Sequence, residues 1–77
     1  MNEIVIYIRE FDVSQWLTFY LTDSYIFSQF LEDTQNIWNH HVSYQRCFYC
    51  MDTQRFVDMD ADGKTNGIRS GDRLILV

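Results

Sequence analysis

Two cysteines and two histidines form the first group of side chains that could do chemistry. Cys47 and Cys50 make a C-x-x-C motif, and His40 and His41 lie shortly before it. Two thiolates with one or two imidazoles are a ligand set that zinc accepts in tetrahedral sites. The motif falls in a β-rich run, however, and residues three apart on a strand point to opposite faces, which disfavours joint chelation and a disulfide. A redox motif would also need a helix N-terminus to lower the thiol pKa, and none follows. We therefore expect one core cysteine, one surface cysteine and solvated histidines, with no bound metal.

An acidic segment is the second group. The spacing of its first carboxylates and its glycine matches the first half of a helix-flanked calcium loop, in which alternate positions supply oxygen ligands. The residues that would take part are Asp58, Asp60, Asp62, Gly63 and Asn66. The position that should hold a bidentate acid is Arg69, and no helices are expected on either side. We therefore expect an acidic, glycine-bent surface loop, with a weak calcium site at 58–69 as the alternative.

No arrangement of residues resembles a catalytic centre. The sequence has no phosphate-binding glycine loop and no Ser/His/Asp spacing of note, and its carboxylates fall mainly on predicted turns and on the polar side of one helix. A chain of 77 residues also has little room for a concave, desolvated pocket. We expect a protein that is not an enzyme and has no cofactor.

The order of the elements follows from residue type and period. Runs rich in β-branched and aromatic residues predict strands, and apolar residues at helical spacing after the N-cap candidates Thr22, Asp23 and Ser24 predict a helix. The expected strands are 2–8, 16–21, 45–51, 55–57 and 73–77, and the expected helix is 23–38. All three glycines lie between 63 and 71, which indicates a long turn-rich segment before the last strand.

This order, ββαβ(β)β, predicts an α+β fold of the ubiquitin-like β-grasp type, with one domain over 1–77. In such a fold a mixed four- to five-stranded sheet has its last strand parallel to its first, and one helix packs on one face. A ferredoxin-like fold would need a second long helix, for which the chain has no room.

Composition and net charge limit the classes of partner that the protein is expected to bind. The chain is 47% hydrophobic and 17% aromatic, which favours a packed core over disorder. Its net charge of -5 argues against nucleic acid or an anionic membrane as partner. No apolar run approaches the ~20 residues of a membrane span. The start of the sequence has no basic region, so we expect no signal peptide. We expect the two cysteines to be free thiols and the protein to be cytoplasmic.

The segment 67–77 resembles the closing strand of ubiquitin-like domains. Its "GI..GDRL.I" pattern is carried by Gly67, Ile68, Gly71, Asp72, Arg73, Leu74 and Leu76. In length, element order and this motif the chain is similar to the YukD/EsaB-type ubiquitin-like proteins associated with type VII secretion in Gram-positive bacteria. The resemblance implies an accessory or regulatory part of that secretion machinery and supplies no catalytic residues. Because the sequence ends at Val77 without Gly-Gly, we also expect neither conjugation nor sulfur carriage.

Strand alternation predicts a second functional feature, an apolar face turned away from the helix. The alternation turns one set of residues toward the helix, with Ile26, Phe30 and Ile37 packed against it. That inward set is Ile4, Ile6, Ile8, Leu17, Phe19, Leu21, Cys47, Tyr49, Leu74 and Leu76. The outward set is Val5, Tyr7, Trp16, Tyr20, Phe48, Ile75 and Val77. An open sheet normally keeps its outer face polar, and a patch of this kind could exceed the ~300–600 Å² found on ordinary monomers. The alternative is a wrong parity in one strand.

The leading hypothesis is a non-catalytic ubiquitin-like adaptor that docks a protein partner through this face, either membrane-embedded secretion machinery or a second copy in a homodimer. It would not insert into the membrane itself. Two other hypotheses remain open. One is an ion-responsive binding protein that uses the 58–69 loop, and the other is an acidic phage or mobile-element inhibitor that occupies a basic groove of a host protein.

Overall fold

A mixed sheet and one helix make up the domain. The computed structural model describes residues 2–38 and 46–77. The sheet is five-stranded, in the order β2-β1-β5-β3-β4. Its strands are β1 (Glu3–Glu10), β2 (Leu17–Thr22), β3 (Phe48–Cys50), β4 (Arg55–Phe56) and β5 (Arg73–Leu76), and the helix is α1 (Phe27–Asp33). The expected α+β class and order of elements are confirmed.

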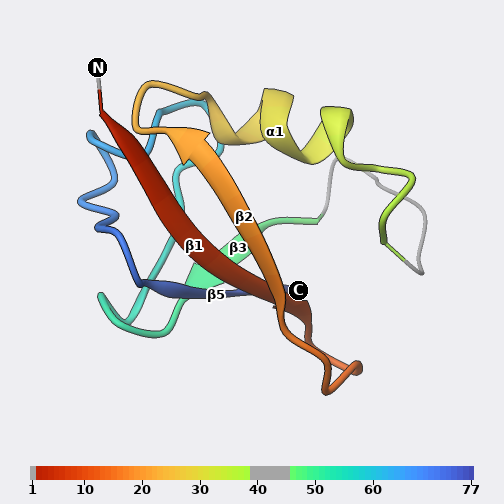
Figure 1. Cartoon of the computed structure of the whole chain (residues 1–77). Helices are drawn as coiled ribbons and strands as arrows, with labels where there is room; N and C mark the ends of the chain where they lie inside the picture. The colour runs from red at the N-terminus through yellow and green to blue at the C-terminus, as the bar shows by residue number, and fades with distance from the viewer. Residues whose placement is uncertain (1, 39–45) are drawn as a thin grey trace.

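The first and last strands form the parallel centre of the sheet. β1 pairs with β5 in parallel, with Ile8 opposite Leu74, whereas the other pairings are antiparallel. The turn before β5 extends this pairing, because the Gly71 amide donates to the Val5 carbonyl at 2.7 Å and the Ser70 hydroxyl accepts from the Val5 amide at 3.0 Å. Gly71 has φ +94°, a left-handed conformation that glycine adopts without a Cβ penalty. α1 lies across one face of the sheet (Figure 1).

The core lies between α1 and the sheet. The inward side chains of β1 and β5 are buried, and Ile6, Ile8, Leu74 and Leu76 have no exposed area, nor does Phe48 of β3. Phe48 meets Phe27, Phe30 and Trp38 at ring-centroid distances of 5.8, 6.0 and 6.5 Å. The pairs with Phe27 and Trp38 are edge-to-face and the pair with Phe30 is tilted, and such ring contacts are favourable in addition to the area they bury. The aromatic content of the sequence is thus concentrated where the helix meets the sheet.

The helix is shorter than the sequence pattern predicted. The structure gives Phe27–Asp33 in place of 23–38, and the N-cap is Ile26, without a side-chain cap. Thr22 begins a turn instead, since its carbonyl accepts from the Tyr25 amide at 3.1 Å. The first amides of α1 find their acceptors in a distant loop: Phe27 donates to the carbonyl of Ala61 at 3.2 Å and Ser28 to that of Met59 at 2.8 Å.

Helix packing also differs from the prediction in two residues. The buried residues of α1 are Phe27, Phe30 and Leu31, as the periodicity of an amphipathic helix requires. Ile26 and Ile37, both predicted to face the core, are 39% and 49% exposed and lie outside the helical segment. The apolar pattern was right for the helix itself and for Trp38 beyond it, and wrong for these two residues.

Candidate functional site

The face of the sheet opposite α1 carries most of the residues that the sequence placed there. Val5 and Tyr7 alternate with the buried Ile4, Ile6 and Ile8 on β1. The other predicted outward residues that the structure leaves half-buried or exposed are Trp16, Tyr20, Ile75 and Val77. Tyr20 lies opposite Val5 in the register and is 73% exposed. We call this surface the outer face.

One predicted member of the outer face is wrong. Phe48 has 0% exposure and lies in the core. The reason is its register with β5: Phe48 pairs with Leu76 and Cys50 with Leu74, and both leucines point inward. Directly opposite residues share a face, so β3 has the parity opposite to the predicted one. Cys47 and Tyr49, predicted to face inward, are half-buried on the other side.

Two aromatic residues of the outer face were missed. Tyr49 lies opposite Phe56 of β4, and their ring centroids are 5.1 Å apart. Phe56 is 65% exposed. One signal in the sequence favoured the observed parity: the Tyr49 hydroxyl needs water or a partner, whereas Phe48 has no polar atom to satisfy when buried. The outer face therefore consists of Val5, Tyr7, Trp16, Tyr20, Tyr49, Phe56, Ile75 and Val77, with Arg9 and Arg73 among them.

These residues join into a row across the sheet. Ile75 of β5 lies opposite Arg9 on one side and opposite Tyr49 on the other, and Tyr49 continues to Phe56. The row ends at Trp16, whose ring lies 5.2 Å from the Arg9 guanidinium carbon. Nη1 of Arg9 also donates to the carbonyls of Glu10, Phe11 and Val13, which holds the connection between β1 and β2 in place. The row is thus supported by backbone pairing and by a fixed cation.

The charge of the outer face differs from that of the whole chain. The net charge of the protein is -5, yet the middle of this face carries the two cations Arg9 and Arg73. Arg73 pairs with Asp52, with 3.3 Å between Nη2 and Oδ1, and its backbone amide donates to Oδ2 at 2.7 Å. These hydrogen bonds hold the pKa of Asp52 below its usual value. An acidic protein thus presents aromatic rings and guanidinium groups on one side.

The carboxylates of the acidic loop accept hydrogen bonds from the backbone amides of the same loop. Oδ1 of Asp58 accepts from the Asp60 amide at 3.0 Å, and Oδ1 of Asp62 accepts from the Thr65 amide at 2.7 Å. The hydrogen bonds from Thr65 lower the pKa of Asp62. Asn66 braces the loop, since its Oδ1 accepts from the Asp58 amide at 2.7 Å and its Nδ2 donates to the carbonyls of Asp58 and Asp62. Within 2–38 and 46–77, no group of three or more His, Cys, Asp and Glu side chains is placed to hold a metal ion.

The bend of this loop is not at the predicted glycine. Gly63 is buried, and a Cβ there would lie 3.4 Å from the Asp23 carbonyl oxygen and 3.5 Å from a methyl group of Ile4. The left-handed glycine is Gly67, with φ +73°. Gly67 therefore makes the left-handed turn, whereas Gly63 packs in ordinary van der Waals contact with its neighbours.

The two cysteines point to different environments, as the strand alternation predicted. Cys50 is buried in the core, Cys47 is half-buried, and both are free thiols. His40 and His41 lie outside the described residues.

The comparisons with known proteins add no assignment: no protein-family model matches the chain, and no curated protein matches it. Among the described residues, no helix has the length and apolar character needed to cross a membrane.

Proposed function

We propose that this chain is a ubiquitin-like β-grasp domain. The parallel pairing of its first and last strands and the single helix over one face agree with the fold expected from the order of elements. The strand order β2-β1-β5-β3-β4 places the strand that carries the "GDRL.I" motif at the centre of the sheet. The motif that carries the resemblance is therefore also the segment that joins the two halves of the sheet.

The proposed function is that of a non-catalytic protein-interaction module that docks through the outer face. The observation that carries this proposal is the continuous row of Trp16, Ile75, Tyr49 and Phe56 across a face that an open sheet normally keeps polar. Aromatic residues and arginine are the types enriched at the buried centre of protein interfaces. Burying such a row against a partner would remove apolar ring surface from water, which favours association.

The proposed setting is the cytoplasmic side of a type VII secretion system, where the domain serves as an accessory or regulatory component. This part rests on the resemblance of 67–77 to the YukD/EsaB-type proteins. The partner would be a cytoplasmic portion of the membrane machinery, and the domain itself would not insert into the bilayer. A homodimer through the same face is the competing use of that surface.

Affinity capture with matched variants tests the proposal. The tagged wild-type chain, Tyr20→Asp, Ile75→Asp and the control Ile37→Asp are each used to capture partners from a detergent lysate of the organism that encodes the chain. Tyr20 and Ile75 lie on the outer face, whereas Ile37 is an exposed apolar residue outside it. All variants change an apolar or aromatic side chain to the same charge, so only position differs. Thermal melts confirm that each variant is folded.

The expected result is a type VII ATPase or channel subunit retained by wild type and Ile37→Asp and lost with Tyr20→Asp and Ile75→Asp. Equal capture by all four proteins would overturn the outer face as the docking site. Capture that contains no secretion component would overturn the secretion role. A dimer seen by sedimentation equilibrium and broken by Tyr20→Asp would assign the face to self-association.

A further inference from the structure

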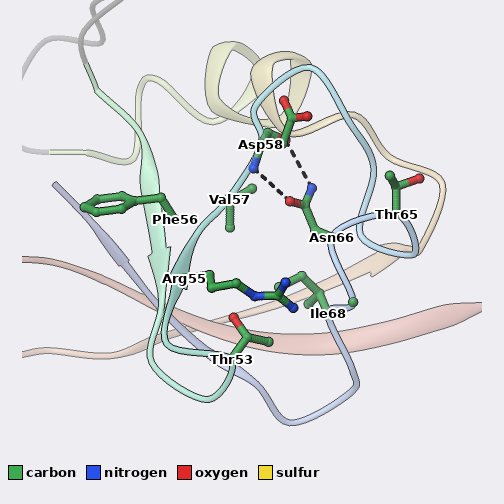
Figure 2. A pocket seen from close by; sticks show the side chains of 9 residues that line it. Thr53, Arg55, Phe56, Val57, Asp58, Thr65, Asn66 and Ile68 are labelled. Atoms are coloured by element: carbon green, nitrogen blue, oxygen red, sulfur yellow. Dashed lines mark hydrogen bonds between the residues drawn. The ribbon is translucent and has the colours of Figure 1, made fainter.

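A hollow at the β4 edge of the sheet has the features of a second binding site. It has a volume of about 190 Å³ and lies between β4 and the segment that leads to Gly67 and Ile68. Val57 and Ile68, both buried to 6% exposure, form its apolar floor. In Figure 2 the Arg55 side chain extends across the hollow toward Ile68, with Thr53 below it. The site thus combines hydrocarbon, a cation and a hydroxyl group.

The exposed Arg55 is the cation that lines this site. In the described part of the chain its guanidinium group has no ion pair or hydrogen bond, whereas Arg46 pairs with Glu10 and Arg73 with Asp52. Gly67, in a left-handed conformation with φ +73°, makes the turn that brings the opposite rim within van der Waals reach of Arg55. A guanidinium beside an apolar floor is suited to a carboxylate, which it binds through charge-assisted hydrogen bonds.

The rim of the hollow is held in place before any ligand arrives. The side-chain amide of Asn66 is hydrogen-bonded to the backbone of Asp58 and Asp62, so it stabilises the rim and is not available to a ligand. Asp58 also lines the hollow, but in Figure 2 its carboxylate points away from the centre, and its Oδ1 accepts from the Asp60 amide. A preformed rim lowers the entropy that binding must overcome.

The open edge of β4 adds backbone groups to the site. β4 is the last strand of the sheet and pairs only with β3. The Val57 amide donates to the Phe48 carbonyl at 2.8 Å, so by strand alternation the N–H and C=O of Phe56 point away from β3. Phe56 also lines the hollow. An extended chain that pairs with Phe56 would therefore place alternate side chains next to Arg55.

We propose that the β4 edge binds an extended acidic segment of a partner protein, with a glutamate carboxylate on Arg55, its methylenes on Val57 and Ile68, and the residue next to that glutamate paired with the backbone of Phe56. The occupant follows from charge complementarity: the one cation that lines the hollow has no partner in residues 2–38 and 46–77. This site shares Phe56 with the outer face but uses its backbone edge and the Arg55 side chain, so a domain whose outer face binds nothing can still accept a glutamate here.

The test is an NMR titration of the ¹⁵N-labelled protein with a glutamate residue capped as the N-acetyl N-methylamide. This probe supplies the carboxylate and two peptide groups, and the equally capped glutamine is its uncharged match. The protein variants are Arg55→Gln and, as control, Arg69→Gln, which removes the same charge from an exposed residue that does not line the hollow. We expect saturable shifts of the Phe56 and Gly67 amides with capped glutamate. Binding should weaken roughly tenfold in Arg55→Gln, since a hydrogen bond to a charged group is lost, and stay unchanged in Arg69→Gln.

Several outcomes would overturn the inference. They are shifts without saturation, equal binding of capped glutamine, and equal weakening by Arg55→Gln and Arg69→Gln. Inorganic phosphate that binds at Phe56 and Gly67 more tightly than capped glutamate would make this an ion site and overturn the peptide assignment. None of these results changes the capture experiment with Tyr20→Asp, so failure here and failure of the proposed function are separable.

Discussion

The two faces of one sheet, built from alternate residues of the same strands, differ in the chemistry of their side chains. The face under α1 is made mainly of aliphatic residues and phenylalanine, with Cys50 and the buried Glu10 in the same inward set, and its central members are fully buried. The outer face carries tyrosine, tryptophan and arginine beside a few aliphatic residues. Rings with a polar tip tolerate water when exposed and can still be desolvated in a complex. The comparison separates residues that hold the fold from residues available for a partner.

The neighbours Phe48 and Tyr49 test this separation with the largest expected effect. Phe48→Ala should lower the free energy of unfolding by about 3–5 kcal/mol, because it removes a fully buried ring and leaves a cavity. Tyr49→Ala removes a half-buried ring that contacts Phe56 and should cost only about 1–2 kcal/mol. Urea denaturation of both variants measures the two values.

Equal losses in Phe48→Ala and Tyr49→Ala would contradict the observed parity of β3. A larger loss in Tyr49→Ala would restore the parity that the sequence first indicated.

The two thiols sharpen the same comparison by a chemical route. In the native protein Cys47 should react with a thiol reagent roughly tenfold or more faster than Cys50, because reaction of a buried thiol requires local opening. Single variants Cys47→Ser and Cys50→Ser assign the rates, and both thiols should react alike in denaturant. Comparable native rates would mean that β3 opens readily or that its register differs.

A smaller effect is expected where the outer face is most exposed. Tyr20→Thr keeps a residue of good strand propensity and should change the free energy of unfolding by no more than about 0.5 kcal/mol. Tyr20 is 73% exposed, so little of its ring is removed from water on folding. A loss well above this value, measured in the same urea experiment, would mean that Tyr20 serves the fold and not a partner.

The smallest effect lies beside α1, at an exposed carboxylate. The Tyr25 hydroxyl donates to Asp33, as does the Gln29 amide, and these bonds lower the pKa of Asp33. Tyr25→Phe should therefore move the pKa of Asp33 upward toward about 3.9, the ordinary value. Carboxyl ¹³C NMR titration measures it, and Asp62 serves as the unaffected control because its pKa depends on Thr65.

The same pKa shifts give the sign of the acid response. Asp33, Asp52 and Asp62 all have a lowered pKa in the folded state. Each therefore contributes stability above the unfolded value of about 3.9, and that contribution is lost as the pH falls through the folded pKa. The melting temperature should fall between pH 5 and pH 3, and a rise over that interval would contradict these hydrogen bonds.

Most of the sheet could be predicted because each face has its own residue types. Ile4, Ile6 and Ile8 fix the inward parity of β1, and Leu74 and Leu76 fix that of β5. In β3, by contrast, Phe48 and Cys50 are about as apolar as Cys47 and Tyr49, and the Tyr49 hydroxyl is the one local sign of which side faces water. The choice is made by pairing with β5, a contact between segments far apart in the sequence.

The site was predicted less completely for the same reason. Arg55 stands next to Phe56 in a strand of only two residues, and neither side chain is part of a recognisable motif. The hollow beside them forms only when Gly67 and Ile68 return to the edge of the sheet. Likewise, the sequence predicted that a polar side chain before the helix would cap it. In the structure the carbonyls of Met59 and Ala61 accept from the first helical amides instead.

This last arrangement has a consequence for how the chain reaches its fold. Since the first amides of α1 are satisfied by residues 59 and 61, the helix lacks a start of its own, and a seven-residue helix is too short to persist alone in water. A peptide covering residues 22–38 should be largely unstructured by circular dichroism. We therefore expect helix formation in this domain to depend on contacts with distant residues, so that helix and sheet form in one cooperative transition.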